Sequence, residues 1–379
     1  MTFFRNLVHH PRKLFLRKAL FQIHLWAGIA LSLYVVIIAV TGSILVFEDE
    51  LTATTFPSGL SRYDSARTAP IPAVLHAFNA ACPGCVANSL TTPSPMVPAY
   101  QILATDPQRR ELGFVADPTT GAVYRQPRTW VNWVHDLHVY LLLGSAHGEQ
   151  VNGVGAAILL LLSITGIFLW WPGLKNWTRG LRIGMRHNWR RINFDAHNAI
   201  GFWTLALVCW WGISGVYFGW FRQFEAAVNS VFPLSGMLAP GLPALSPSEH
   251  RASLAAVIAA VQQASPKGRL FGLSDPSLAG RVVYAQMDLR APGDFSHRDI
   301  ITVDTASARI LTVWHYGCNQ TLGDWFMWSM HPLHFGTLWG LPIKILWFLL
   351  GLSLAVLSVT GLLMYWNRYL RHQLAKRPH

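Results

Sequence analysis

Charged residues are scarce in this chain: Asp, Glu, Lys and Arg together make up 13% of its 379 residues. Acidic residues are scarcest, with 18 Asp and Glu against 30 Lys and Arg, whereas 52% of the residues are hydrophobic. Such a composition argues against two or three soluble domains. Uncharged stretches longer than the ~20 residues that cross a bilayer core as a helix occupy 19–47, 150–174, 196–221 and 345–366. The sequence therefore predicts a polytopic membrane protein with four spans.

Signatures of nucleotide-dependent and zinc-dependent chemistry are also missing. The chain has no Gly-x-Gly-x-x-Gly motif after a predicted strand, no Walker A motif and no His-Glu-x-x-His motif. It therefore has no recognisable nicotinamide, ATP or zinc-protease site.

Cysteines are few, at positions 82, 85, 209 and 318. Cys82-Pro-Gly-Cys85 is either a redox dithiol or a small structural disulfide in an oxidising compartment. The disulfide is favoured because no thioredoxin-like strand and helix surround the motif. No His follows Cys85, which excludes covalent attachment of a c-type haem. Cys209 is interpreted as a small apolar filler within the third span.

The net charge of +12 is concentrated in three short segments, residues 1–18, 175–195 and 367–379. Because Lys and Arg concentrate on the cytoplasmic side of membrane proteins, these segments and both termini are expected to be cytoplasmic. The loops 48–149 and 222–344 are then exported. Topology and contact with anionic lipids explain the basic excess, so no nucleic-acid partner is expected. The first span has no small-residue cleavage site and is interpreted as a retained signal anchor.

Each exported loop is expected to form a small α+β module. Amphipathic helices are predicted at 70–81 and 247–264. Strands are predicted at 98–104, 111–116 and 122–125 in the first loop, and at 269–273, 281–288 and 299–304 in the second. Asp117-Pro-Thr-Thr-Gly121 and Asp304-Thr-Ala-Ser-Ala308 occupy matching places and are predicted to be turns between terminal strands.

Two of the spans open with the same pattern. His24 is followed by Gly28 and His197 by Gly201, and helical rise places both histidines near the cytoplasmic edge of the membrane core. An ionisable side chain at this depth is a functional candidate by default. Two neutral imidazoles on different helices can bind a haem iron axially from opposite faces, so this pair predicts a bis-histidine haem site.

A second pair, His138 and His334, is expected near the exported side. Straight-helix arithmetic fits it less well, because His138 lies 34 residues before Pro172. Residues 131–143 are therefore expected to form a separate interfacial helix. The depth in the membrane, counted along a straight helix back from Pro172, favours His147 instead of His138. We predict His138 and His334 as the ligands of a second haem, with His147, His331 and His135 as substitutes.

Each span also ends in a hydroxyl residue followed by glycine, at 41–42, 165–166, 214–215 and 360–361. These pairs are interpreted first as close helix packing in lipid and second as clearance for a cofactor. Asp136 and Asp195 lie two residues from His138 and His197. They are weaker candidates for hydrogen bonding to those imidazoles, because side chains two apart on a helix diverge.

The order of these motifs resembles the PepSY-associated transmembrane family, often described as iron-regulated membrane proteins. The resemblance covers nearly the whole chain and rests on His24…Gly28…Thr41-Gly42-Ser43, Asp136-Leu-His138 with Thr165-Gly166…Trp170-Trp171-Pro172, His197…Gly201…Ser214-Gly215, and His331-Pro-Leu-His334-Phe-Gly336 with Thr360-Gly361. Within the family, the length and compact four-span form resemble the di-haem siderophore reductases of the FoxB type.

The resemblance implies a multi-pass protein of the bacterial inner membrane. The expected fold is a membrane all-α four-helix bundle with two exported PepSY-like α+β modules, built by internal duplication. The expected enzyme is a haem-dependent ferric-siderophore reductase with two b-type haems, whose axial ligands to the haem iron are His24, His197, His138 and His334. Electrons would come from a separate cytoplasmic donor or a membrane quinol. Two other interpretations stay open: a siderophore or iron transporter, and a PepSY-type regulatory protein that binds a partner.

Overall fold

The computed structural model describes residues 15–145, 147–235, 242, 245, 249–290, 297–315 and 321–371. Most of the basic segment 1–18, most of the tail 367–379 and the start of the helix predicted at 247–264 lie outside these residues. The chain divides into two compact units. We call them the helical unit (Met1–Val46, Trp133–Ala227 and Leu333–His379) and the sheet unit (Phe47–Asn132 and Val228–Pro332), and each is described by itself.

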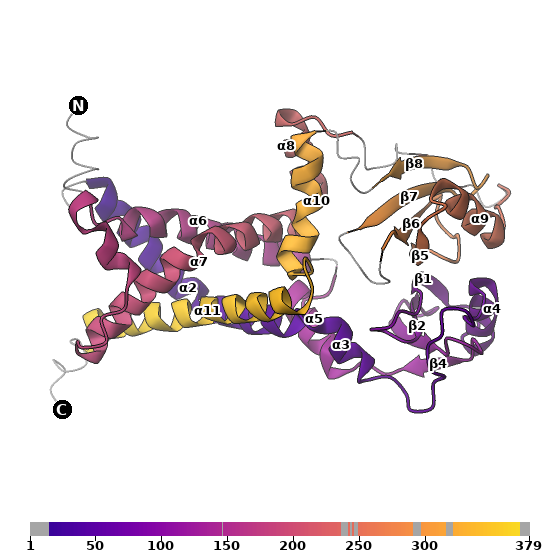
Figure 1. The fold of residues 1–379 in the computed structure, drawn as a ribbon, viewed down its shortest axis with the longest axis horizontal. Coiled ribbons are helices and arrows are strands. Elements are labelled where there is room, and N and C mark those ends of the chain that lie inside the picture. Colours follow the sequence, from indigo (N-terminus) through magenta and orange to yellow (C-terminus); the bar gives the residue numbers. More distant parts are fainter. Residues whose placement is uncertain are drawn as a thin grey trace. The chain divides into compact units, whose positions relative to one another are not determined.

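The helical unit contains the predicted spans (Figure 1). Among the described residues, four helices are long and apolar enough to cross a membrane. They are α2 (Phe15–Leu45), α6 (Gly148–Trp170), α7 (Trp189–Gly219) and α11 (Leu341–Tyr365), which the π-helical segment η3 (Trp366–Leu370) continues. α2 packs against α6 and α11, and α7 packs against the same two helices.

Small residues let these helices approach one another closely. A methyl group added at Gly215 would lie 2.6 Å from Cβ of Ala156, and one at Gly219 would lie 2.8 Å from Cα of Gly153. Such contacts are the usual way in which apolar helices associate where lipid removes the hydrophobic driving force. Large apolar side chains such as Leu33 point outward and are exposed, as a lipid-facing surface requires.

The second and fourth spans differ slightly from their predicted limits. α6 ends at Trp170 instead of residue 174, because Pro172 cannot continue a helix and constrains the residue before it. A 3₁₀ segment, η2 (Leu174–Leu181), follows. α11 begins at Leu341, where Pro342 in its first turn suits a helix start.

The expected separate helix before the second span is present as α5 (Trp130–Tyr140). The chain then breaks at Leu141, Leu142 and Gly144, all with positive φ, before α6 begins. Three further short helices are α3 (Glu48–Ala53), α8 (Phe221–Val231) and α10 (Leu322–Phe335). The first boundary between the two units lies between α2 and α3, and the other three fall within α5, α8 and α10.

The sheet unit holds one antiparallel sheet of eight strands in the order β4-β3-β2-β1-β5-β6-β7-β8. The first-loop strands are β1 (Val86–Thr91), β2 (Tyr100–Thr105), β3 (Glu111–Ala116) and β4 (Val123–Gln126). The second-loop strands are β5 (Arg269–Ser274), β6 (Val282–Asp288), β7 (Arg298–Asp304) and β8 (Ile310–Trp314). The six predicted strands correspond to β2–β7 within two residues at each end. The first predicted turn joins β3 to β4 as expected, and the second joins β7 to β8, a strand that was not predicted.

The expectation of two separate modules is wrong for the sheet, because β1 of the first loop pairs with β5 of the second. Ser89 lies opposite Ser274, and Thr91 opposite Gly272. Thr92 extends this seam by donating its N–H to the carbonyl of Phe271 at 2.8 Å. An unpaired edge strand is a liability that pairing removes, so each loop covers the open edge of the other.

The hydrophobic cores, by contrast, remain one per loop. In the first, α4 (Ile71–Ala81) buries Val74 and Phe78 among residues of β1, β2 and β3. In the second, α9 (Leu254–Ala264) buries Val257 and Val261 among residues of β5, β6 and β7. α9 begins at Leu254 because the hydroxyl of Ser253 accepts the N–H of Ala256 at 3.2 Å.

Candidate functional site

The first predicted histidine pair lines a single cavity of about 590 Å³ in the helical unit. His24 comes from α2 and His197 from α7, and α6 and α11 complete the walls. Most of the lining is apolar, which is typical of cofactor pockets of this size. The glycines of the sequence motifs also line it: Gly28, Gly166, Gly201 and Gly361.

Each histidine of this pair is hydrogen-bonded to a threonine on a neighbouring helix. Nδ1 of His24 lies 2.9 Å from Oγ1 of Thr165, and Nδ1 of His197 lies 3.0 Å from Oγ1 of Thr360. The Thr165 hydroxyl already donates to the Leu161 carbonyl at 2.8 Å, and Thr360 makes the same bond within α11. Because a hydroxyl has one proton to donate, it accepts from the imidazole. The proton therefore belongs on Nδ1, and Nε2 keeps the lone pair that a metal requires.

The glycine after each threonine gives the ring its space. A methyl group added at Gly166 would lie 3.4 Å from Cε1 of His24, and one at Gly361 would lie 3.4 Å from Cε1 of His197. Thr165-Gly166 and Thr360-Gly361 thus each supply a hydrogen-bond acceptor and room for one imidazole, a role that neither helix packing nor cofactor clearance had predicted. At Gly215 the packing interpretation holds, because an added methyl group would meet Ala156.

The second pair repeats the arrangement. Nδ1 of His138, on α5, lies 3.0 Å from Oγ1 of Thr41, and Nδ1 of His334, on α10, lies 2.7 Å from Oγ of Ser214. Both hydroxyls also donate to a carbonyl four residues earlier in their own helix. The same argument therefore leaves Nε2 of both rings as the unprotonated nitrogen.

The two rings of this second pair face one another. Their centroids lie 6.4 Å apart, with an angle of 59° between the planes. A metal held between two imidazole nitrogens at about 2 Å from each leaves the ring centres roughly 6 Å apart, so the spacing suits bis-histidine ligation. Burial, and secondarily the nearby His135, lower the pKa of His138 to about 4. The ring is therefore neutral at pH 7.

The three substitute histidines occupy other environments. His147 is exposed and immediately precedes α6. His135 lies 3.4 Å from the carboxylate of its neighbour Asp136. His331 falls in the sheet unit, where burial and, to a smaller extent, Arg298 lower its pKa to about 4.

The weaker acidic candidates have other contacts. Asp195 pairs with Arg191 at 2.9 Å and accepts the N–H of Gly184. Asp136 lies against His135, as above. Each of the four predicted ligands is instead hydrogen-bonded to a hydroxyl.

Arginines line one end of the first cavity, at the start of α2, the start of α7 and the end of α11. They are Arg17, Arg190 and Arg368. Arg17 also donates to main-chain carbonyls where α6 ends, those of Phe168, Leu169 and Trp171. Guanidinium groups bind carboxylates well, so this end of an apolar cavity suits a ligand that carries acidic groups.

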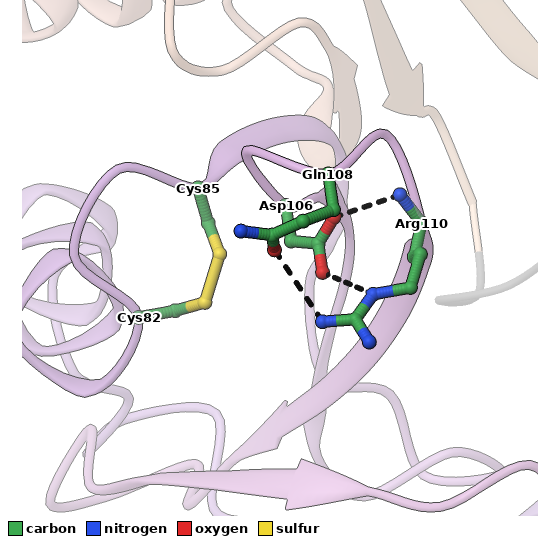
Figure 2. Close-up of a disulfide and its surroundings, with 5 residues drawn as sticks. All are labelled: Cys82, Cys85, Asp106, Gln108 and Arg110. Atoms are coloured by element: carbon green, nitrogen blue, oxygen red, sulfur yellow. Dashed lines mark hydrogen bonds and ion pairs between the residues drawn. A yellow bond between two sulfur atoms is a disulfide. The ribbon is translucent and has the colours of Figure 1, made fainter.

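Cys82 and Cys85 form a disulfide in the sheet unit (Figure 2). It closes the turn between α4 and β1, beside the β2–β3 turn in which Arg110 pairs with Asp106 at 2.7 Å. Cys82 caps the C-terminal end of α4, the negative end of the helix dipole. Redox-active thiolates are stabilised at helix N-termini instead, so this position favours a structural crosslink.

Within the described ranges, no group of three or more His, Cys, Asp or Glu side chains is placed to hold a metal ion. Each histidine pair offers two ligands, the number that a haem iron takes from its protein in a bis-histidine site. The donor set, the unprotonated Nε2 atoms and the apolar cavity beside His24 and His197 fit such a group.

Spanning-length helices joined to a separate antiparallel sheet unit define a multi-pass membrane protein with an α+β module. Residues 21–368 match the family described as the PepSY-associated TM region. The match covers nearly the whole chain, which therefore belongs to this family, as the motifs predicted. A search of curated proteins finds no significant match.

Proposed function

We propose that this protein is a di-haem oxidoreductase of the bacterial inner membrane that reduces a ferric siderophore on the periplasmic side. The observation that carries the proposal is the geometry of the four histidines, each of which presents an unprotonated Nε2 because a hydroxyl accepts its Nδ1–H. His24 and His197 would hold one b-type haem, and His138 and His334 a second. Haem iron supplies one-electron chemistry, cycling between the ferric and ferrous states.

The chain's own residues bind, orient and insulate the haems. The hydroxyls of Thr165, Thr360, Thr41 and Ser214 fix the tautomer and orientation of the ligands. The apolar walls of the cavity exclude water, which stabilises a cofactor of low polarity. Arg190 and Arg368, which line the cavity of His24 and His197, would bind the acidic groups of a porphyrin.

The overall reaction transfers one electron from a donor to the ferric ion of the chelate. A cytoplasmic donor or a membrane quinol would supply the electron, since the sequence has no recognisable nucleotide site. Siderophores bind iron through hard oxygen ligands, which hold ferrous iron more weakly than ferric iron. Reduction therefore releases the metal, and no side chain needs to bond covalently to the substrate.

The matching contacts in the two halves of the chain support internal duplication of a four-helix bundle. Thr165 is hydrogen-bonded to His24 of the first half, and Thr360 is hydrogen-bonded in the same way to His197 of the second. Thr41 and Ser214 correspond in the same way for His138 and His334. By the positive-inside rule both termini would be cytoplasmic, and the sheet unit would be periplasmic.

The test is a dithionite-reduced minus oxidised visible spectrum of the detergent-purified protein, with haem counted as the pyridine haemochrome. About two low-spin b-type haems per chain are expected. The variant His24→Ala/His197→Ala should retain about one. Oxidation of the reduced protein by a ferric siderophore then tests the substrate. A normal haem content in the double variant contradicts the pairing, and a haem-free wild type contradicts the reductase.

A further inference from the structure

The histidines of the second pair lie at the ends of their helices. His138 is two residues from the end of α5, and His334 is one residue from the end of α10. The last four carbonyls of a helix have no partner within it. Backbone carbonyls at both histidines therefore need hydrogen-bond donors from elsewhere, and these donors control where the two rings sit.

In the first half of the chain, the donor is Asn152 of α6. Its Nδ2 donates to the carbonyls of His138 at 2.7 Å and Val139 at 3.2 Å. The side-chain oxygen of Asn152 accepts the hydroxyl proton of Tyr34, on α2, at 2.7 Å. This contact fixes which way the amide faces, so its NH₂ group points to α5.

The face of α6 around Asn152 is shaped for these contacts. Gly148 lies one turn before Asn152, and Gly155 lies one turn after it, on the same side of the helix. A methyl group added at Gly148 would collide with the backbone of Tyr140, the last residue of α5. One added at Gly155 would collide with the ring of Tyr34. Because the two glycines have no side chains, α5 and Tyr34 of α2 can approach α6 closely enough to bond to the Asn152 amide.

In the second half of the chain, tryptophan indoles donate the corresponding hydrogen bonds. Nε1 of Trp211, on α7, donates to the carbonyl of His334 at 3.3 Å. Nε1 of Trp347, on α11, donates to the neighbouring carbonyl of Leu333 at 2.8 Å. Spanning helices therefore hold the ends of both short helices, through an amide on one side and indoles on the other.

We propose that Asn152, oriented by Tyr34, and Trp211 are the positioning residues that set the distance and angle between the rings of His138 and His334. They act through the backbone of each histidine, whereas Thr41 and Ser214 act on its ring. The role of the two rings as haem ligands rests on the proposed function. The anchoring of α5 and α10 does not, so the two claims can be tested apart.

The first experiment uses hydrogen exchange of the full chain in detergent, without added haem. Asn152→Leu keeps the side-chain volume and removes the amide donors, and Trp211→Phe keeps an aromatic ring and removes the indole N–H. We expect exchange within α5 to rise at least tenfold in Asn152→Leu, with α10 unchanged. Trp211→Phe should show the converse, so each variant is the control for the other. Unchanged exchange in both, or equal changes in both helices, would overturn the proposal.

The second experiment reads the haem-loaded protein by electron paramagnetic resonance, in which two low-spin ferric sites give two sets of g values. Both variants should shift the set that belongs to His138 and His334 and leave the other set unchanged. A loss of stability alone would not move one set selectively.

Should Asn152→Leu fail to fold, Tyr34→Phe keeps the amide but frees its orientation, and a smaller shift of the same set is expected. No shift in Tyr34→Phe would then overturn the role of Asn152. A protein without haem contradicts the proposed function, and the exchange result still decides the anchoring.

Discussion

Nδ1 of His24 and Oγ1 of Thr165 lie 2.9 Å apart, although 141 residues separate them in the chain and they belong to different spanning helices. Since the hydroxyl proton of Thr165 is already committed to a carbonyl of its own helix, the contact assigns the imidazole proton. A side chain that looks like simple helix packing thus determines which nitrogen of the histidine is available to a metal.

Thr165→Val and Thr360→Val should therefore weaken haem binding at the first pair. Valine keeps the shape of threonine but cannot accept the Nδ1 proton, and losses of this kind typically cost about 10–100-fold in metal affinity. Titration of apoprotein with haemin, followed in the Soret band, measures the effect. Thr204→Val is the matched control, because among the described residues that buried hydroxyl bonds only to the Ile200 carbonyl of its own helix. Equal losses in all three variants would contradict this prediction.

Gly42→Ala should disturb the second pair. The added methyl group would lie 2.7 Å from Cε1 of His138, a contact that real Cβ atoms avoid, so the ring or the helix must move. We expect altered g values for the haem of the second pair and a lower occupancy of that site. Gly28→Ala is the control for this readout, since its methyl group meets only Leu162, at 3.9 Å. An unchanged signal in Gly42→Ala would argue against His138 as a ligand.

The Cys82–Cys85 disulfide should stabilise the sheet unit without affecting the haems. A crosslink across so short a loop is worth roughly 2 kcal/mol in the chain-entropy treatment. We expect Cys82→Ser/Cys85→Ser to lower the opening free energy of β1 by about this amount, measured by hydrogen exchange. Haem content and reduction of the ferric siderophore should match the wild type. A double variant that binds haem normally but loses reductase activity would instead indicate a redox dithiol.

Acid should destabilise the sheet unit through Asp117. Burial alone would raise the pKa of this carboxylate, but hydrogen bonds from Thr120, Ser61 and Thr119 lower it from 3.8 to about 2. A pKa depressed in the folded state means that the stabilisation is complete above pH ~4 and is lost as the pH falls from about 4 to 2.

Urea unfolding at pH 6 and pH 3 tests this dependence. Asp117→Asn should lower the midpoint at pH 6 and reduce its further fall at pH 3. Asp64→Asn is an exposed control, since its contact with Arg67 is 3.8 Å long and asparagine can still accept the Ala66 N–H that Asp64 accepts at 3.0 Å. Identical pH dependence in the wild type and Asp117→Asn would rule out this carboxylate as the source.

The helices α3, α8 and α10 and the strand β8 were not predicted. The spans, the helices α4, α5 and α9, and the strands β2–β7 could be predicted from the sequence, because each depends on local pattern. β1 could not, and its register shift between Ala87 and Ser89 gives the reason. A bulge of this kind breaks the alternation of buried and exposed residues that marks a strand. The polar residues Asn88 and Ser89 then look like a loop.

The joining of the two loops could not be predicted either. Pairing between β1 and β5 depends on which two edges meet, and no local periodicity encodes that choice. In the candidate site, the repeated sequence frames predicted His24 with His197 and His138 with His334, whereas helical depth alone favoured His147 over His138. The carbonyl contacts of Asn152 and Trp211 could not be predicted from a repeated motif. The donor to the histidine carbonyl is an amide in the first half of the chain and an indole in the second.

The seam between β1 and β5 also has a consequence for biosynthesis. Ser89 can pair with Ser274 only after the ribosome has added 185 further residues. At about 5–20 residues per second this delay lasts roughly 10–40 s. During that interval the first loop carries an open strand edge, which is a template for aggregation. Synthesis of the second loop is therefore the event that completes the sheet of the first, and a stall between them would leave a nascent chain that depends on chaperones.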